Sequence, residues 1–416
     1  MIFIKTKKLY SPYAVLSVIY IFFIFVAFFI DTPKNIIYGL KNIILSPDIL
    51  ISDYVEIGGI GASLLNSALT SILSMILLII IGVKPNGSTI MSLWLMTGFA
   101  FFGKNIINVW PIIIGVFLYS KYQKEQFISY SLLALLSTTL SPAISQFMFI
   151  SDMPFIIGLI IGYIIGILIG FLLAPIASHA IKAHNGYNLY NIGFAAGLFA
   201  TLFMAILRAV GINFETRLLW NKDSTFTFSI ILYTVSIYLI VIGLINNKNY
   251  KENFSKLLKQ PGRLVSDFYL LYDKTCYINM GLLGILSTSL IILLKADLNG
   301  ATTAGVSTII GFGAFGKHIK NVIPILIGSI LASIININPI NSPSIILAIL
   351  FSTGLAPIAG KFGFFIGIIA GFLHINMVMN VGYLHGGLNL YNNGLAAGLV
   401  AMILIPIVTD LKKGDT

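Results

Sequence analysis

The sequence predicts an all-α integral membrane protein built from two related halves of opposite topology. The 416-residue chain is 57% hydrophobic and only 9% charged, whereas a soluble domain carries about 25% charged residues. Long apolar runs recur from end to end, and roughly 20 apolar residues suffice to cross a bilayer. Related segments in the two halves indicate an internal duplication.

The duplication rests on three pairs of segments that occur in the same order. His184–Ala200 reads HNGYNLYNIGFAAGLFA and His385–Ala401 reads HGGLNLYNNGLAAGLVA, with 12 of 17 positions identical. Gly103–Val116 and Gly316–Ser329 share 9 of 14 positions. The weaker third pair is Ser137–Phe147 with Ser352–Phe362. We therefore expect two repeats, residues 1–212 and 213–416.

Each repeat contains five apolar runs long enough to cross a bilayer. The predicted crossings are 13–31, 57–82, 127–147, 154–177, 187–210, 225–246, 276–294, 343–359, 363–380 and 388–408. The first run follows a basic N-terminus but precedes no small-residue cleavage site, so it predicts a retained helix rather than a signal peptide.

Two further apolar regions, 89–120 and 302–335, are each interrupted by a Gly-Lys pair. Their shorter arms of about 14 residues would be roughly 21 Å long as helices, less than the roughly 30 Å hydrocarbon core. They predict re-entrant hairpins, which are tolerated at membrane depth only where protein or a water-filled cavity surrounds them. The expected breaks in the helices lie at Gly103, Pro111, Pro142, Gly316, Pro324 and Pro357.

The basic residues orient this layout. Lysines precede the first crossing, fill the connector 247–275 and follow the last crossing, and such clusters favour the cytoplasmic side. With five crossings per repeat, both termini and the connector fall on that side of the cell membrane together. An odd number of crossings also requires the repeats to be inverted, which places a substrate path at their interface. The connector itself predicts a surface helix ending at Pro261-Gly262.

The interrupted regions supply the first candidate site. A lysine at membrane depth is costly and by default functional, and two of them at helix N-termini would attract an anion or the oxygens of a polar solute. Alternatively, each lysine reaches the interface or a lipid phosphate. The residues are Lys104, Asn105 and Asn108, with Lys317, His318 and Asn321 in the second repeat.

The longest repeated segment supplies the second candidate site, with Asn188, Tyr190 and Asn191 in the first repeat and Asn389, Tyr391 and Asn392 in the second. Amides and phenols in a spanning helix need partners, and amides three residues apart share one helix face. They either line a path or tie broken helix ends together, beside glycines suited to close helix packing.

Other function classes find no support in the sequence. The net charge of +11 comes from basic residues between apolar spans, so it predicts membrane orientation rather than nucleic-acid binding. Cys276 is the only cysteine, which excludes a disulfide framework. Motifs for nucleotide phosphates, zinc hydrolysis and a serine nucleophile are missing. We therefore predict no catalytic residue, no metal and no cofactor.

Two resemblances follow from these segments. HNGYNLYNIGFAAG, HGGLNLYNNGLAAG and FGKNIINVWPIIIGV resemble a bacterial family of uncharacterised polytopic membrane proteins, which supplies no activity. The architecture is similar to that of urea transporters, which implies inverted five-crossing halves around a narrow pore and a homo-oligomer. Their LPxxTxPF signature is echoed only by Leu136–Pro142 and Ser352–Pro357, and the paired lysines depart from an uncharged pore.

The sequence thus predicts a channel, facilitator or transporter that moves a small polar solute, urea-like or a small anion, through the lipid bilayer. The spans contain almost no carboxylates, which are usual in proton relays, and this favours a channel or facilitator. The alternatives are an intramembrane enzyme acting on lipid and a membrane scaffold without transport. The symmetry of the halves argues against the enzyme.

Overall fold

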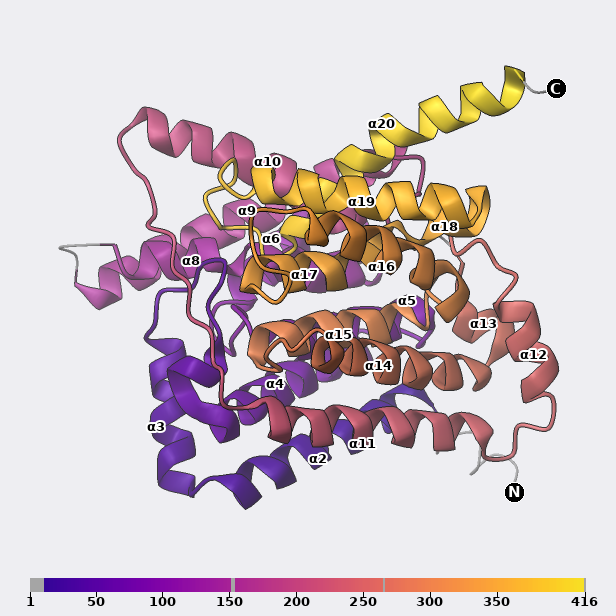
Figure 1. The fold of residues 1–416 in the computed structure, drawn as a ribbon. Helices are drawn as coiled ribbons and strands as arrows, with labels where there is room; N and C mark the ends of the chain where they lie inside the picture. The colour runs from indigo at the N-terminus through magenta and orange to yellow at the C-terminus, as the bar shows by residue number, and fades with distance from the viewer. Residues whose placement is uncertain (1–10, 151–153, 265, 415–416) are drawn as a thin grey trace.

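The computed structural model describes residues 11–150, 154–264 and 266–414 and is helical throughout, without a β-strand in those ranges (Figure 1). Its elements are α2 (Pro12–Ile30), α3 (Pro33–Ile44), α4 (Tyr54–Ile80), α5 (Gly87–Phe99), α6 (Trp110–Tyr122), η1 (Phe127–Tyr130), α7 (Ser131–Ser137), η2 (Thr138–Leu140), α8 (Ser141–Met148), α9 (Phe155–Ala183), α10 (Asn191–Ala209), α11 (Thr225–Leu244), α12 (Tyr250–Leu257), α13 (Phe268–Tyr272), α14 (Thr275–Leu293), α15 (Gly300–Phe312), α16 (Ile319–Ile334), α17 (Pro343–Ser352), η3 (Thr353–Leu355), α18 (Ala356–Phe362), α19 (Phe364–Val381) and α20 (Asn392–Gly414).

Within the described residues, 10 helical segments are long and apolar enough to cross a membrane, as the sequence predicted. They are α2, α4, η1–α8, α9, α10, α11, α14, α17–α18, α19 and α20. Most of them run along a common direction in Figure 1. The protein is therefore a multi-pass membrane protein by length and composition of its helices.

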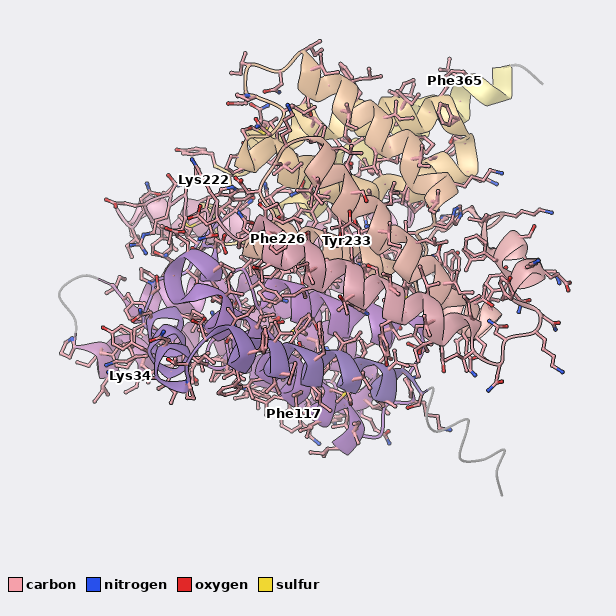
Figure 2. The ribbon with its side chains drawn as sticks, turned by 60° about the horizontal axis from the view of Figure 1, so that its bottom comes forward. Lys34, Phe117, Lys222, Phe226, Tyr233 and Phe365 are labelled. Carbon is pink, nitrogen blue, oxygen red and sulfur yellow. The ribbon has the colours of Figure 1, made fainter. Side chains whose placement is uncertain are left out.

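The outer surface of the bundle is apolar, as contact with lipid requires. Phe29 of α2 is 80% exposed and Phe226 of α11 is 76% exposed, and Figure 2 shows Phe226 on the outer face of α11. The interior of the bundle instead holds polar side chains, including Asn66 of α4 and Asn279 of α14, which are fully buried. An apolar outer surface around a core that also holds buried polar side chains is typical of a membrane protein.

Elements at equivalent places in the two repeats correspond throughout the fold. Asn66 donates from Nδ2 to the carbonyls of Ala100 and Lys104, and Asn279 donates from Nδ2 to the carbonyls of Gly313 and Lys317. In each case a buried amide satisfies backbone carbonyls freed where a short helix ends. The duplication seen in the sequence therefore extends to α4 and α14, where identities are few.

Two predicted spans begin later than expected. The segments from residue 187 and from residue 388 are not helical until Asn191 and Asn392, where α10 and α20 start. The side chains of Asn188 and Asn389 accept hydrogen bonds from the backbone N–H two residues ahead, a turn that competes with helix formation. Asn188 and Asn191 therefore do not share a helix face.

The spans predicted at 127–147 and 343–359 are also interrupted. A short 3₁₀ turn, η2, divides the first span, and η3 divides the second. Pro142 and Pro357 lie in the first turn of the helix that follows, where the missing N–H and the proline ring disfavour one continuous helix.

Two further differences concern the connecting segments. A short helix not expected from the sequence, α3, follows α2 directly, with Thr32 as N-cap and Pro33 in the first turn. The connector helix α12 ends at Leu257, before the Pro261-Gly262 stop that the sequence predicted. Helices α12, α13 and the C-terminal end of α20 lie at one end of the bundle, and α3 lies at the other (Figure 1).

The close approach of α10 and α20 gives a first test. A Cβ at Gly394 would lie 2.8 Å from the Cα of Gly193, so we expect Gly394→Ala to push α10 and α20 apart, with the cost of overpacking, about 1–3 kcal/mol. The measurement is the apparent melting temperature in detergent, which should fall. Gly382→Ala is the matched control, because its nearest neighbour is 3.9 Å away. Equal melting of the two variants would contradict this packing.

Candidate functional site

The centre of the molecule is the crossing of α10 and α20 near their first turns. Gly193 and Gly394, at equivalent positions of the two repeats, lie against each other. Asn188 donates from Nδ2 to the Gly394 carbonyl at 2.9 Å, and Asn389 donates from Nδ2 to the Gly193 carbonyl at 3.0 Å. Each repeat therefore anchors the helix start of the other, through the same group.

The histidines before these helices are part of the anchor. Nε2 of His184 lies 3.0 Å from Oδ1 of Asn191, and Nε2 of His385 lies 2.7 Å from Oδ1 of Asn392. Burial lowers the pKa of both histidines, so at neutral pH each ring is uncharged and the amide oxygen selects the tautomer with hydrogen on Nε2. These histidines fix the turn that ends in the central tyrosine.

The two Gly-Lys turns reach this centre from different elements. Gly103 and Gly316 have φ values of +91° and +104°, a region in which glycine is favoured. They end α5 and α15 and turn the chain toward α6 and α16. Lys104 and Lys317 follow directly, and both are 0% exposed. The chain is not helical at either glycine.

Each buried lysine pairs with the tyrosine of the other repeat. Lys104 Nζ donates to the Tyr391 hydroxyl at 2.7 Å, and Lys317 Nζ donates to the Tyr190 hydroxyl at 2.5 Å. We name these two interactions the crossed Lys–Tyr pairs. Each ammonium also lies over aromatic rings, with Lys104 4.8 Å from the Tyr391 centroid and Lys317 4.6 Å from that of Tyr190. Rings and phenol oxygens, rather than carboxylates, stabilise the two charges.

The pairs differ in their remaining partners. Lys317 also donates to the Thr353 hydroxyl at 2.8 Å. Lys104 instead lies 3.7 Å from the sulfur of Met96, and the hydroxyl of Thr138, the counterpart of Thr353, turns to the same sulfur at 3.5 Å. The first repeat thus offers its lysine a weaker second acceptor than the second repeat does.

A cavity of about 160 Å³ lies between the crossed Lys–Tyr pairs. Fourteen of its 17 lining residues form seven pairs of equivalent positions in the two repeats. The pairs are Leu95 with Thr308, Phe99 with Phe312, Leu136 with Phe351, Leu189 with Leu390, Tyr190 with Tyr391, Ile192 with Asn393, and Gly193 with Gly394. Both repeats therefore contribute equivalent positions to the wall of this cavity.

Only some residues of the predicted path line this cavity. Tyr190, Asn191 and Tyr391 do, whereas Lys104 and Lys317 contact the tyrosines behind its wall. Asn188, Asn389 and Asn392 support the crossing of α10 and α20 instead. The structure adds lining residues that the sequence prediction left out, chiefly Phe99, Phe312, Phe351 and Asn393. The first two lie five residues before each lysine, a spacing that repeats in the sequence.

The remaining polar residues of the Gly-Lys turns brace the turns themselves. The side chains of Asn105 and Asn108 each accept a hydrogen bond from the backbone N–H of the other residue. The side chains of His318 and Asn321 do the same in the second repeat. Asn108 and Asn321 also donate to the carbonyls of Gly103 and Gly316. Pro111 lies in the first turn of α6, and Pro324 lies inside α16.

Asp48, between α3 and α4, is a buried carboxylate that was not among the residues singled out from the sequence. It accepts hydrogen bonds on Oδ2 from Asn108 at 3.0 Å and Asn105 at 3.4 Å, and its Oδ1 has no partner. Burial raises the pKa of this carboxyl to about 8. The equivalent position in the second repeat, 213 residues later, is Pro261. Because Asp48 has no counterpart, comparison of the repeats alone could not have identified it.

Among the described residues, no cluster of three or more His, Cys, Asp or Glu side chains could hold a metal ion. The polar groups at the centre are amides, hydroxyls and ammonium groups, which suit binding of a polar solute rather than a metal.

The fold is that of a polytopic helical membrane protein. The chain belongs to the family described as "Protein of unknown function (DUF1576)", whose model matches residues 32–209 and 246–410. Comparison with curated proteins and with solved structures gave no match.

The raised pKa of Asp48 gives a test of pH dependence. The folded protein holds this proton up to a pH of about 8, while the unfolded chain releases it near 3.8. The proton therefore stabilises the fold at low pH, and this contribution is lost as pH rises toward and through 8. We expect the melting temperature of wild type to fall relative to that of Asp48→Asn between pH 5 and pH 9. The melting temperature of Asp223→Asn, at an exposed position, should change with pH as that of wild type does. The same pH dependence of the melting temperature in all three proteins would refute the raised pKa of Asp48.

Proposed function

We propose that this protein is a membrane channel or facilitator for a small polar solute, urea-like or a small anion, whose path runs through the central cavity. The observation that carries the proposal is the cavity lined by equivalent positions of both repeats, with a crossed Lys–Tyr pair on each side. Solute paths at the interface of inverted repeats are typical of transport proteins.

Contacts between α5 and α15 support an inverted arrangement of the repeats. Gly98 of α5 faces Ser307, whereas Gly311 of α15, the counterpart of Gly98, faces Trp94, the counterpart of Ser307. Equivalent helices thus pack antiparallel, around an axis perpendicular to both. With these helices along the membrane normal, such an axis lies in the membrane plane, which is the inverted arrangement.

Packing also supports re-entrant hairpins at 89–120 and 302–335. Helix α5 begins beside the connector, because Asp267 accepts from the Gly87 N–H. Helix α6 runs parallel to α9, with Pro111 against Gly166 and Gly115 against Ile167, and α9 ends next to Asn185, whose carbonyl accepts from Arg263 of the connector. Both arms of this hairpin therefore point their outer ends to the connector side. The second hairpin begins at the other side, where Asp53 accepts from the Gly300 N–H.

The crossed Lys–Tyr pairs suit a solute that accepts hydrogen bonds. Because the lysine donates to the phenol oxygen, the phenol hydrogen can donate to another acceptor. For Tyr190 the Thr353 hydroxyl, at 3.5 Å, is one such acceptor. A hydroxyl that accepts from a cation is also a stronger donor. A carbonyl oxygen or an anion in the cavity would take this hydrogen from Tyr190 or Tyr391. The ammonium groups act on the solute through the tyrosines, without direct contact.

The aromatic walls limit the size and number of solute molecules. A volume of about 160 Å³ equals roughly five water molecules at about 30 Å³ each. Phe99 and Phe351 stack at a centroid distance of 5.7 Å, and Phe312 lies 5.1 Å from Tyr190. Such a lining would admit a flat or small solute and would offer little to a large hydrated ion.

Flux through liposomes tests the function. We expect wild-type protein to conduct urea, formamide or a small anion, and Tyr190→Phe with Tyr391→Phe to lower that flux about tenfold, because the hydrogen-bond donors are lost while the rings remain. Light scattering or a halide-sensitive dye measures it, and Tyr122→Phe, 72% exposed, is the control. Unchanged flux in the double variant would remove the tyrosines from the path. Absence of flux for every solute, with lipid turnover instead, would favour an enzyme.

Accessibility tests the proposed sidedness. The native Cys276 is fully buried, so single cysteines can be introduced in the otherwise unchanged chain. We expect Lys251→Cys in α12 to react from the cytoplasm only, and Lys34→Cys in α3 to react from outside only, because the two helices lie at opposite ends of the bundle. A membrane-impermeant maleimide on intact cells and inverted vesicles gives the readout. Labelling of both sites from one side would contradict the layout.

A further inference from the structure

A second cavity lies outside the Lys317 turn, and we propose that it binds an oxyanion, a phosphate or carboxylate group. The cavity has a volume of about 390 Å³ and lies between the connector, the first turns of α16 and the α18–α19 junction. We name it the connector pocket. The proposal concerns binding alone and does not depend on the proposed transport.

The charge of the connector pocket points to an anion. Lys259, Lys320 and Lys361 contribute from three separate elements, and the lining contains no carboxylate. All three lysines are exposed, so their long side chains can turn into the pocket. A concave site with three like charges and no counter-charge raises the local concentration of anions.

Backbone and neutral polar groups complete the site. Gln260, His318 and Asn321 line the same pocket. His318 bonds the Gln260 carbonyl at 2.9 Å through Nε2 and caps the Asn321 N–H through Nδ1, so it holds the connector against the start of α16. This 16-residue helix directs the positive end of its dipole at the pocket. The dipole adds to the positive potential of the three lysines, which is the main attraction for an anion.

Comparison of the repeats shows that this charge is not inherited from the duplicated fold. The positions equivalent to Lys259, Lys320 and Lys361 are Ser46, Ile107 and Gln146. The same place in the first repeat is filled by Asp48. Its backbone N–H donates to the Ser145 hydroxyl, its carbonyl accepts from Gln146, and its carboxylate accepts from Asn108. An excess of basic residues on one side of a membrane protein sets its orientation, but orientation does not require three of them around one cavity.

Two sources could supply the oxyanion, a free anion or the headgroup of an anionic lipid. Phe364 lines the pocket and Phe365 beside it is 79% exposed, so the pocket adjoins an apolar outer surface. Figure 2 shows Phe365 and Lys34 far apart, at opposite ends of the molecule. Lys34 and Lys41 of α3, both exposed, therefore provide a matched removal of two positive charges away from the pocket.

The test measures binding of inorganic phosphate and of dioctanoyl phosphatidic acid to the purified full chain in neutral detergent. We expect at least one probe to raise the melting temperature of wild type, and Lys320→Gln with Lys361→Gln to weaken that probe at least tenfold. Lys34→Gln with Lys41→Gln should bind as wild type does. A response to phosphate identifies a free anion, and a response to the lipid alone identifies a headgroup. The proposal is overturned by equal binding to the pocket variant, by equal loss in the control, or by no response in wild type.

Discussion

The crossed Lys–Tyr pairs are the interaction on which the rest of the structure depends. A lysine in the middle of a membrane helix costs about 2.5–3.5 kcal/mol, and this chain buries two of them without a carboxylate partner among the described ion pairs. Each lysine nitrogen donates instead to a neutral phenol oxygen from the other repeat. Separation of the repeats would leave both ammonium groups unpaired in an apolar interior, so the pairs hold the halves together.

Placing those lysines requires broken helices, and broken helices require buried amides. Each turn exposes carbonyls that lipid cannot satisfy, and Asn66 and Asn279 take up those around Lys104 and Lys317. The tyrosines sit at the start of α10 and α20 because asparagine and histidine side chains stop the helices there. The polar residues inside this bundle therefore serve first to end helices within it. The tyrosines at the start of α10 and α20 face the cavity.

The sequence predicted the features that depend on composition and repetition, and missed those that depend on contacts between distant segments. Apolar length located the ten spans, and the repeated Gly-Lys and Asn-Tyr-Asn segments located both partners of each crossed pair. Which lysine meets which tyrosine follows from packing between repeats, and no local pattern encodes it. Phe99 and Phe312 were not predicted, because an apolar side chain that faces a cavity cannot be told from one that faces lipid by sequence. Asp48 was not predicted, because sequence does not reveal that a loop folds back into the interior.

The two repeats are alike at the central cavity and differ in the residues around their Gly-Lys turns. Seven pairs of equivalent residues line the central cavity, whereas one Gly-Lys turn is covered by a buried carboxylate and the other adjoins three lysines. Symmetry at the centre is expected where the crossed pairs need each other, since a change in one repeat would leave a partner of the other unpaired. The two Gly-Lys turns lack this reciprocity at the ends, because Asp48 has no counterpart at Pro261 and the three lysines have none in the first repeat. On the proposed path a solute would therefore meet the same groups at the centre from either side, and the local charge at each end would set its concentration there.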